Sequence, residues 1–179
     1  MRNVQMAQSK GYVFRILAVL AAVIGITSTG IGLSHAASTC VGDICIDQAW
    51  TRATPGAAQE AALYFSISNN SSTDEKLVGV STTAASGAMI HQTTVKDRVV
   101  QMLMVGNVTI PPHGRVLFSP GGYHVMLTGL KAPLKEGTSV SAKLTFASGR
   151  TIEVNIPVLK TTAIGPASAE PPSNRDSRP

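Results

Sequence analysis

The sequence predicts an all-β domain, an antiparallel β-sandwich, and three observations support this prediction. Apolar and polar residues alternate over residues 63–68, and again over 140–146 and 151–158. A period of two is typical of strands that bury one face. Turn signals containing Gly and Pro recur about every ten residues, as in sandwich domains. Between these turns we find no convincing helical period of 3.6 residues and no internal repeat.

The elements follow in order. A polar cluster at residues 69–74 ends the first alternating strand, and residues 76–81 form the next one. The clearest hairpin joins 140–146 to 151–158 through the turn at 147–150. Pro- and Gly-containing turns at 111–114 and 120–122 separate shorter strands. These are expected near 88–93, 99–105, 108–110, 115–119 and 125–128.

The N-terminus has the order of an export signal. A basic stretch ends at Arg15, an apolar run follows, and Ser34-His35-Ala36 offers small residues for a signal peptidase. We expect cleavage after Ala36, so that residues 1–36 are removed. An uncleaved membrane anchor is the alternative, although Thr and Gly residues interrupt the apolar run. A lipoprotein signal ending at Cys40 fits poorly because Thr39 precedes that cysteine.

The remaining chain amounts to one domain, residues 37–160, followed by a tail. Residues 161–179 carry no apolar period and contain four prolines, so we expect a disordered tail. Cys40 and Cys45 flank a Gly-Asp turn at the start of the domain, where a disulfide or two free thiols are expected. A metal-binding pair is the alternative, but a second Cys or His cluster nearby is lacking.

The charge distribution excludes several functions. The formal charge of +5 falls to about +2 once the signal is removed, because Arg2, Lys10 and Arg15 lie in it. No basic stripe remains, so nucleic-acid binding is not expected. Asp97 is the only acid between Met89 and Met126, and neither a Ser-His-Asp arrangement nor paired carboxylates can be identified. We therefore expect that this protein is not an enzyme.

Histidine and methionine concentrate in one stretch, and their spacing indicates a metal site. Three pairs of residues two apart fall on three expected strands, so that each pair projects to one face. Imidazole and thioether donors are soft and uncharged and suit Cu(I). The pairs are Met89 and His91, Met102 and Met104, and His124 and Met126.

Each residue also has an ordinary structural explanation. A lone methionine on a strand commonly fills the core, which we expect for Met89 and Met104. His113 lies in a Pro-Pro-His-Gly turn and is expected to be exposed. A blue-copper redox protein is disfavoured because its Cys ligand is missing beside the histidines. An exported β-sandwich interaction module without physiological metal, with accidental His and Met spacing, is the alternative function.

The spacing and its flanks resemble the PCu(A)C family of periplasmic copper chaperones. His91, Met102, His124 and Met126 match the signature His-x10-Met-x21-His-x-Met. The runs AWTRATPG (49–56), ALY (62–64), IPPHG (110–114) and PGGYHVML (120–127), with GLK (129–131) and PL (133–134), resemble family segments. The resemblance covers residues 44–158.

This resemblance implies a cupredoxin-like Greek-key sandwich that binds one Cu(I) through His91, Met102, His124 and Met126, with Cu(II) binding left open. It further implies a periplasmic chaperone for cytochrome c oxidase assembly, with an oxidase subunit or a Sco-type protein as acceptor and transient membrane-protein contact. Oligomeric state is not implied. Two departures matter. Gln92 replaces the methionine that many relatives carry after the first histidine, and the Cys40 and Cys45 pair is not part of the signature. The tail also lacks the His and Met with which some relatives bind a second copper ion.

Overall fold

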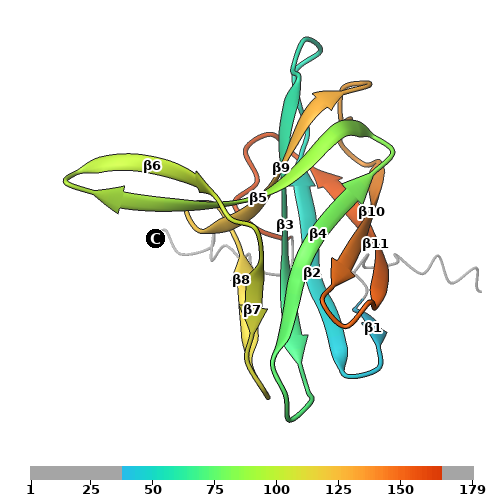
Figure 1. Cartoon of the computed structure of the whole chain (residues 1–179). Helices are drawn as coiled ribbons and strands as arrows, with labels where there is room; N and C mark the ends of the chain where they lie inside the picture. Colours follow the sequence, from blue (N-terminus) through green and yellow to red (C-terminus); the bar gives the residue numbers. More distant parts are fainter. Residues whose placement is uncertain (1–37, 167–179) are drawn as a thin grey trace, which may run out of the picture. The chain divides into compact units, whose positions relative to one another are not determined.

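The computed structural model describes residues 38–166, and this part of the chain forms eleven β-strands (Figure 1). No helix long and apolar enough to cross a membrane occurs within these residues. The signal and its anchor alternative lie outside the described range. The strands are β1 (Thr39–Val41), β2 (Ile44–Arg52), β3 (Glu60–Asn69), β4 (Glu75–Thr82), β5 (Ala85–Lys96), β6 (Val99–Met104), β7 (Val108–Ile110), β8 (Arg115–Phe118), β9 (Tyr123–Leu130), β10 (Ser139–Phe146) and β11 (Thr151–Leu159).

The strands form two layers, and the pairing of β2 with β11 joins one layer to the other. The hydrogen-bonded order is β6-β5-β9-β8-β3-β2-β11-β10-β4-β7, with β1 beside β2 and a further pairing of β9 with β3. One half of β3 pairs with β8 and the other half with β9. The antiparallel prediction holds for most pairs, but β2 and β11 pair in parallel, as do β8 and β9. Thus the predicted sandwich is confirmed, with a mixed sheet.

The core lies between the layers and follows from the alternation within each strand. In β10 and β11 every second residue is buried. Burial of such apolar side chains is the main driving force for the fold. Phe65 of β3 stacks on Phe118 of β8 with ring centroids 4.5 Å apart, which locks the two strands together. The largest fully buried side chains are Phe65, Phe118, Phe146, Ile44, Ile46, Leu63, Ile67, Leu77, Ile110, Leu127, Leu144 and Ile152.

Strand β2 is the main element that the alternation did not indicate. Ala49, Trp50 and Thr51 are all buried, so the strand lacks a polar face there. Its pairing with β3 also shifts register between Asp47 and Trp50. Gln48 has a positive φ of 52° at this bulge. A bulge changes which side chains point inward, and this removes the period of two from the sequence.

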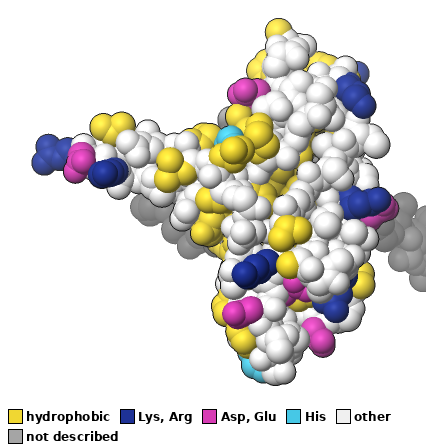
Figure 2. All heavy atoms as spheres, viewed as in Figure 1, with side chains coloured by type: hydrophobic (Ala, Val, Ile, Leu, Met, Phe, Trp, Pro, Cys, Tyr) yellow, Lys and Arg dark blue, Asp and Glu magenta, His cyan; other side chains and the backbone are white. Residues whose placement is uncertain are grey.

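The β5–β6 hairpin extends beyond the sandwich as an arm (Figure 1). Its turn places Asp97 and Arg98 at positive φ, the conformation of a tight type I′ hairpin turn. Val95 pairs with Val100 on the arm, and both side chains are exposed. Figure 2 shows hydrophobic side chains along the arm and charged side chains at its tip.

The two ends of the predicted domain are also defined. Cys40 and Cys45 form a disulfide across the β1–β2 hairpin, so the first of the two expected alternatives is observed. At the other end, the backbone carbonyl of Ala163 accepts a 2.7 Å hydrogen bond from Arg52 Nε. The described first residues of the expected tail therefore contact the domain. Residues 167–179 lie outside the described range.

Candidate metal centre

Strand register brings the two histidines together. On β5, His91 lies directly opposite His124 of β9, and Met89 lies opposite Met126. On the other side of β5, His91 faces Met104 of β6. Cross-strand partners project to the same face of a sheet, so these five side chains share one face. Met102 belongs to it as well, since it is two residues from Met104.

This face is the outer one, opposite the core. Val125, between His124 and Met126, is fully buried and packs into the sandwich. Ile90, between Met89 and His91, is buried on the same inner side. Because side chains alternate along a strand, the metal-ligating candidates must point outward. The same alternation that builds the core thus assembles the site.

The backbone fixes the orientation of His124. Its Nδ1 lies 3.1 Å from the carbonyl oxygen of Gly122. A carbonyl oxygen only accepts, so Nδ1 donates and the neutral ring keeps its free lone pair on Nε2. Ligand histidines in metal sites are commonly held this way. Gly122 is itself held, because its carbonyl accepts a 3.1 Å bond from Thr93 N–H and its N–H donates to Ser119.

His91 shows an unsatisfied polar atom. Its Nδ1 is buried and has no hydrogen-bond partner, the only such side-chain atom among the described residues. Leaving a buried nitrogen unpaired costs about 1–3 kcal/mol. The His91 and His124 rings meet edge to face, with centroids 5.8 Å apart and an interplanar angle of 84°. Because this nitrogen has no hydrogen-bond partner, its lone pair can be free for a metal ion.

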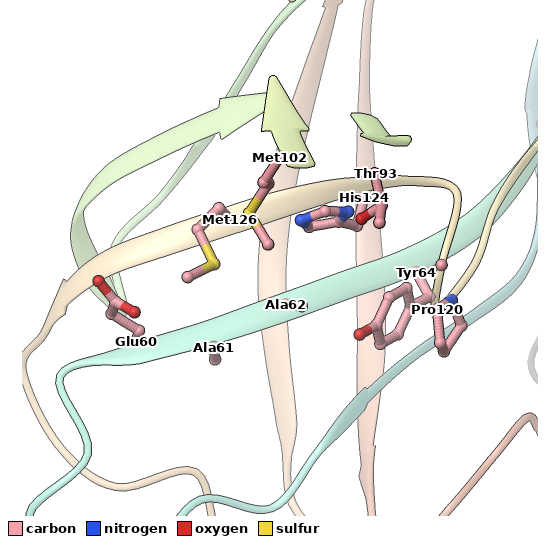
Figure 3. Close-up of a pocket in the computed structure, with 10 residues that line it drawn as sticks. Glu60, Ala61, Ala62, Tyr64, Thr93, Met102, Pro120, His124 and Met126 are labelled. Carbon is pink, nitrogen blue, oxygen red and sulfur yellow. The ribbon is translucent and has the colours of Figure 1, made fainter. Parts of the chain in front are cut away.

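The two thioethers complete a groove beside His124. Met102, His124 and Met126 line a cavity of about 430 Å³ on this face. Figure 3 shows these three side chains directed into the groove, Met102 from β6 and the other two from β9. His124 is only 5% exposed, whereas Met102 is 54% exposed. The histidine is therefore fixed, and the methionine is open to solvent.

The donor set decides which ions fit. Within residues 38–166, no three His, Cys, Asp or Glu side chains are grouped closely enough to hold a metal ion. Hard ions such as Ca²⁺ and Mg²⁺ need oxygen ligands, and structural Zn²⁺ needs thiolates or more imidazoles. Two imidazoles with thioethers form a soft, neutral set, which fits Cu(I).

Two expectations about single residues were wrong, and one is confirmed. Met89 and Met104 do not fill the core: they are 37% and 71% exposed, on the outer face. The period-two rule could have found this, because each lies two residues from a candidate ligand. His113 is exposed in its turn, as predicted.

Two aromatic residues that the sequence analysis did not assign to the site, Tyr64 and Trp50, form or back the wall of the groove. Tyr64 lines it, and its ring packs on Trp50 with centroids 4.6 Å apart. The guanidinium of Arg52 lies 5.6 Å from the centroid of the Trp50 ring. Burial raises the pKa of Tyr64, and the positive charge of Arg52 partly counteracts this. Tyr64 thus provides a neutral wall.

Comparison with known proteins identifies the family. The family model described as "Putative lipoprotein LpqE-like" matches residues 44–158. The chain is 32% identical over 148 residues to "Putative lipoprotein Lxx21020" of Leifsonia xyli subsp. xyli, covering 80% of this chain and 88% of that protein.

Solved structures agree with this assignment. The solution structure of the Cu(I) form of DR1885 from Deinococcus radiodurans is 33% identical with a TM-score of 0.54, covering 75% of this chain and 87% of that one. The apo PCuAC domain of PmoF1 is 27% identical with a TM-score of 0.61, covering 69% of this chain and 99% of that one. The predicted fold and the family resemblance are confirmed. The chain belongs to the LpqE-like family, and its domain is a PCuAC domain.

Proposed function

We propose that this protein is an exported copper chaperone that binds one Cu(I) through His91, Met102, His124 and Met126 and transfers it to an acceptor. One observation carries the proposal: His91 and His124 face each other across β5 and β9, with thioethers around them and a buried unpaired nitrogen on His91. Cu(I) is the cargo of this site. Binding of Cu(II) is a second, separate possibility for the same donors.

The site is suited to release as well as binding. His124 is held by Gly122 and provides a fixed nitrogen donor. Met102 is exposed on a strand at the edge of the sheet, where its thioether can leave the ion without moving the sandwich. All donors are neutral, so an acceptor that offers thiolates would hold Cu(I) more strongly. Transfer by ligand exchange follows, and no catalysed reaction is required.

A similar protein of known structure supports Cu(I) as the bound ion. DR1885 has been solved in a Cu(I) form, and that chain is 33% identical to this one. At this identity the likeness extends beyond the fold alone, so the same ion is the first choice for this site. Ala61, Ala62 and Pro120 line the groove together with the two methionines, and this apolar wall favours a soft, weakly hydrated ion.

Export is supported by the disulfide between Cys40 and Cys45, because such bonds persist in oxidising compartments. The signal at residues 1–36 would direct the chain to the periplasm. Relatives carry the name lipoprotein. In this chain the sulfur of Cys40 is bonded to Cys45, so it is not free to carry a lipid. We therefore propose a cleaved signal without lipid attachment.

The acceptor follows from the family resemblance. We propose copper-centre assembly of cytochrome c oxidase as the destination, with an oxidase subunit or a Sco-type protein receiving the ion. Contact with a membrane-bound acceptor would then be transient.

Anaerobic Cu(I) titration against a chromophoric chelator tests the site. The secreted wild-type protein is expected to bind one equivalent tightly. The double variant His124→Ala, Met126→Ala should lose this affinity, and His113→Ala should keep it because His113 is exposed in a distant turn. If wild type and double variant bind alike, or neither binds, the protein is an interaction module with accidental His and Met spacing.

A further inference from the structure

The outer face that carries His91 and His124 also holds two methionines, Met89 and Met104, that are not among the four proposed ligands. Met89 lies opposite Met126, and Met104 lies opposite His91. Core packing does not explain either, since both side chains are exposed on the outer face. An exposed methionine gains little free energy from burial, so hydrophobic packing does not account for either residue.

Met104 has the more informative position. His91 occupies the middle of a row that runs across three strands, from His124 on β9 to Met104 on β6. Neighbouring strands are about 4.8 Å apart, so His91 has an imidazole on one side and a thioether at a similar distance on the other. Register therefore places Met104 directly beside His91 on the same face of the sheet.

Exposure changes steadily along this row. His124 is 5% exposed, His91 is partly buried, and Met104 is 71% exposed. Strand β6 forms the outer edge of the sheet, so nothing in the described fold lies beyond Met104. An acceptor protein approaching the metal face from this edge meets Met104 first.

We propose that Met104 is the exit ligand of the site: it takes Cu(I) from the His124 and Met126 side, and an acceptor then removes the ion from His91 and Met104. This inference rests on the proposed copper-chaperone function. Met104 is a transient ligand and lies outside the set that holds the ion at rest.

The exchange balances without a redox step. Copper stays Cu(I) throughout. A bond from copper to the sulfur of Met104 forms as the bond to Met126 breaks, and the bonds to Met102 and His124 break next. A thiolate of the acceptor then binds copper, its proton having gone to solvent, and the bonds to Met104 and His91 break last. Because β5 and β6 are paired through six residue pairs, the arm holds Met104 in place during these steps.

The test measures the equilibrium affinity for Cu(I) and the rate of Cu(I) transfer separately. Met104→Leu keeps the size and apolar character of the side chain but removes the sulfur. We expect its equilibrium affinity for Cu(I) to stay within about threefold of the wild type, and its transfer of Cu(I) to excess glutathione, followed anaerobically by stopped flow, to slow by at least about tenfold. Met102→Leu should instead weaken equilibrium binding.

A variant in which Leu103 and Met104 exchange places serves as a control, because it has the same amino-acid composition as the wild type. The variant Leu103→Met, Met104→Leu places the thioether on the opposite face of β6, where Leu103 pairs with Gln92. It should transfer as slowly as Met104→Leu. In wild type labelled with methyl-¹³C methionine, the Met104 methyl resonance should shift and broaden on adding Cu(I), which a purely structural side chain would not do.

Three results would overturn the inference. Transfer at the wild-type rate by Met104→Leu, or by the swapped variant, removes the exit role. A loss of affinity as large as that of the His124 and Met126 variant makes Met104 a resting ligand instead. If the wild type binds no Cu(I), the proposed function fails first and takes this inference with it; tight wild-type binding with unaltered Met104→Leu transfer overturns only the exit role.

Discussion

His91 and His124 face each other across two antiparallel strands with their rings nearly perpendicular, 84° apart, and their centroids 5.8 Å apart. The two residues differ in how their nitrogens are satisfied. His124 has a carbonyl partner at Nδ1, whereas the buried Nδ1 of His91 has none. One nitrogen of the pair is therefore buried without a hydrogen bond in the folded protein. This should lower the free energy of unfolding of the apo protein.

Replacing His91 by leucine should separate stability from metal binding. The substitution removes the buried unpaired nitrogen, so we expect the free energy of unfolding of the apo protein to rise by about 1 kcal/mol. The same variant should lose tight Cu(I) binding and with it any stabilisation by the ion. Thermal denaturation with and without Cu(I) measures both effects. A leucine variant less stable than wild-type apo protein would show that His91 is satisfied in solution.

Val125 should give the opposite result. It lies between His124 and Met126 but points into the core, where it is fully buried. Val125→Ala leaves a cavity and should lower the free energy of unfolding by about 2 kcal/mol. Because its side chain is on the other face of β9, the Cu(I) affinity of the folded variant should change little. Chemical denaturation and chelator competition on the same sample would test this, and a strong loss of affinity would contradict the two-face description.

The alternation that makes Val125 a core residue is also what made much of the fold predictable. The strands at 139–146 and 151–159 have one buried and one more exposed face, and the sequence displays this directly. Strand β2 was missed as a separate element because its bulge and its buried Thr51 break the alternation. Pairing in parallel between β2 and β11 joins residues more than a hundred positions apart, and a local pattern holds no information about it.

The candidate site was predictable in its residue types but not in its geometry. Spacing put His124 and Met126 on one face, but only register shows that His91 lies opposite His124 and that Met104 lies opposite His91. Met89 and Met104 were assigned to the core on residue type alone. They are exposed because they lie on the outer face of the sheet, and Met104 also lies on the edge strand β6.

The disulfide should matter for stability and not for the metal. Cys40 and Cys45 are five positions apart in sequence, so the loop they close is small. The chain-entropy relation gives about 2 kcal/mol for a loop of this size. Cys40→Ser, Cys45→Ser should therefore lower the free energy of unfolding by about that amount and leave Cu(I) affinity unchanged. A fall in Cu(I) affinity in this variant would show that the disulfide-bonded hairpin contributes to the site.

Glu75 should make stability depend on acid pH. Burial alone would raise its pKa, but hydrogen bonds from Ser148 and from the backbone N–H of Lys76, with the charge of Arg150, outweigh it and lower the pKa. The N–H of Lys76 donates to Glu75 Oε1 at 2.9 Å. A carboxylate with a lowered pKa stabilises the fold above its unfolded pKa, and this contribution is lost as pH falls through the folded value.

Glu75→Gln should consequently lower the free energy of unfolding by about 1 kcal/mol at pH 7. The difference between wild type and variant should shrink as pH falls below about 4.5, because the Glu75 carboxylate of the unfolded chain takes up its proton at a higher pH than that of the folded protein. Urea denaturation of both proteins from pH 7 to pH 3 measures the difference. Glu153→Gln serves as the control, because Glu153 is exposed and its ion pair with Lys143 is open to solvent. A Glu75→Gln difference that stayed constant over this range would mean that the loss comes from altered packing rather than from the charge.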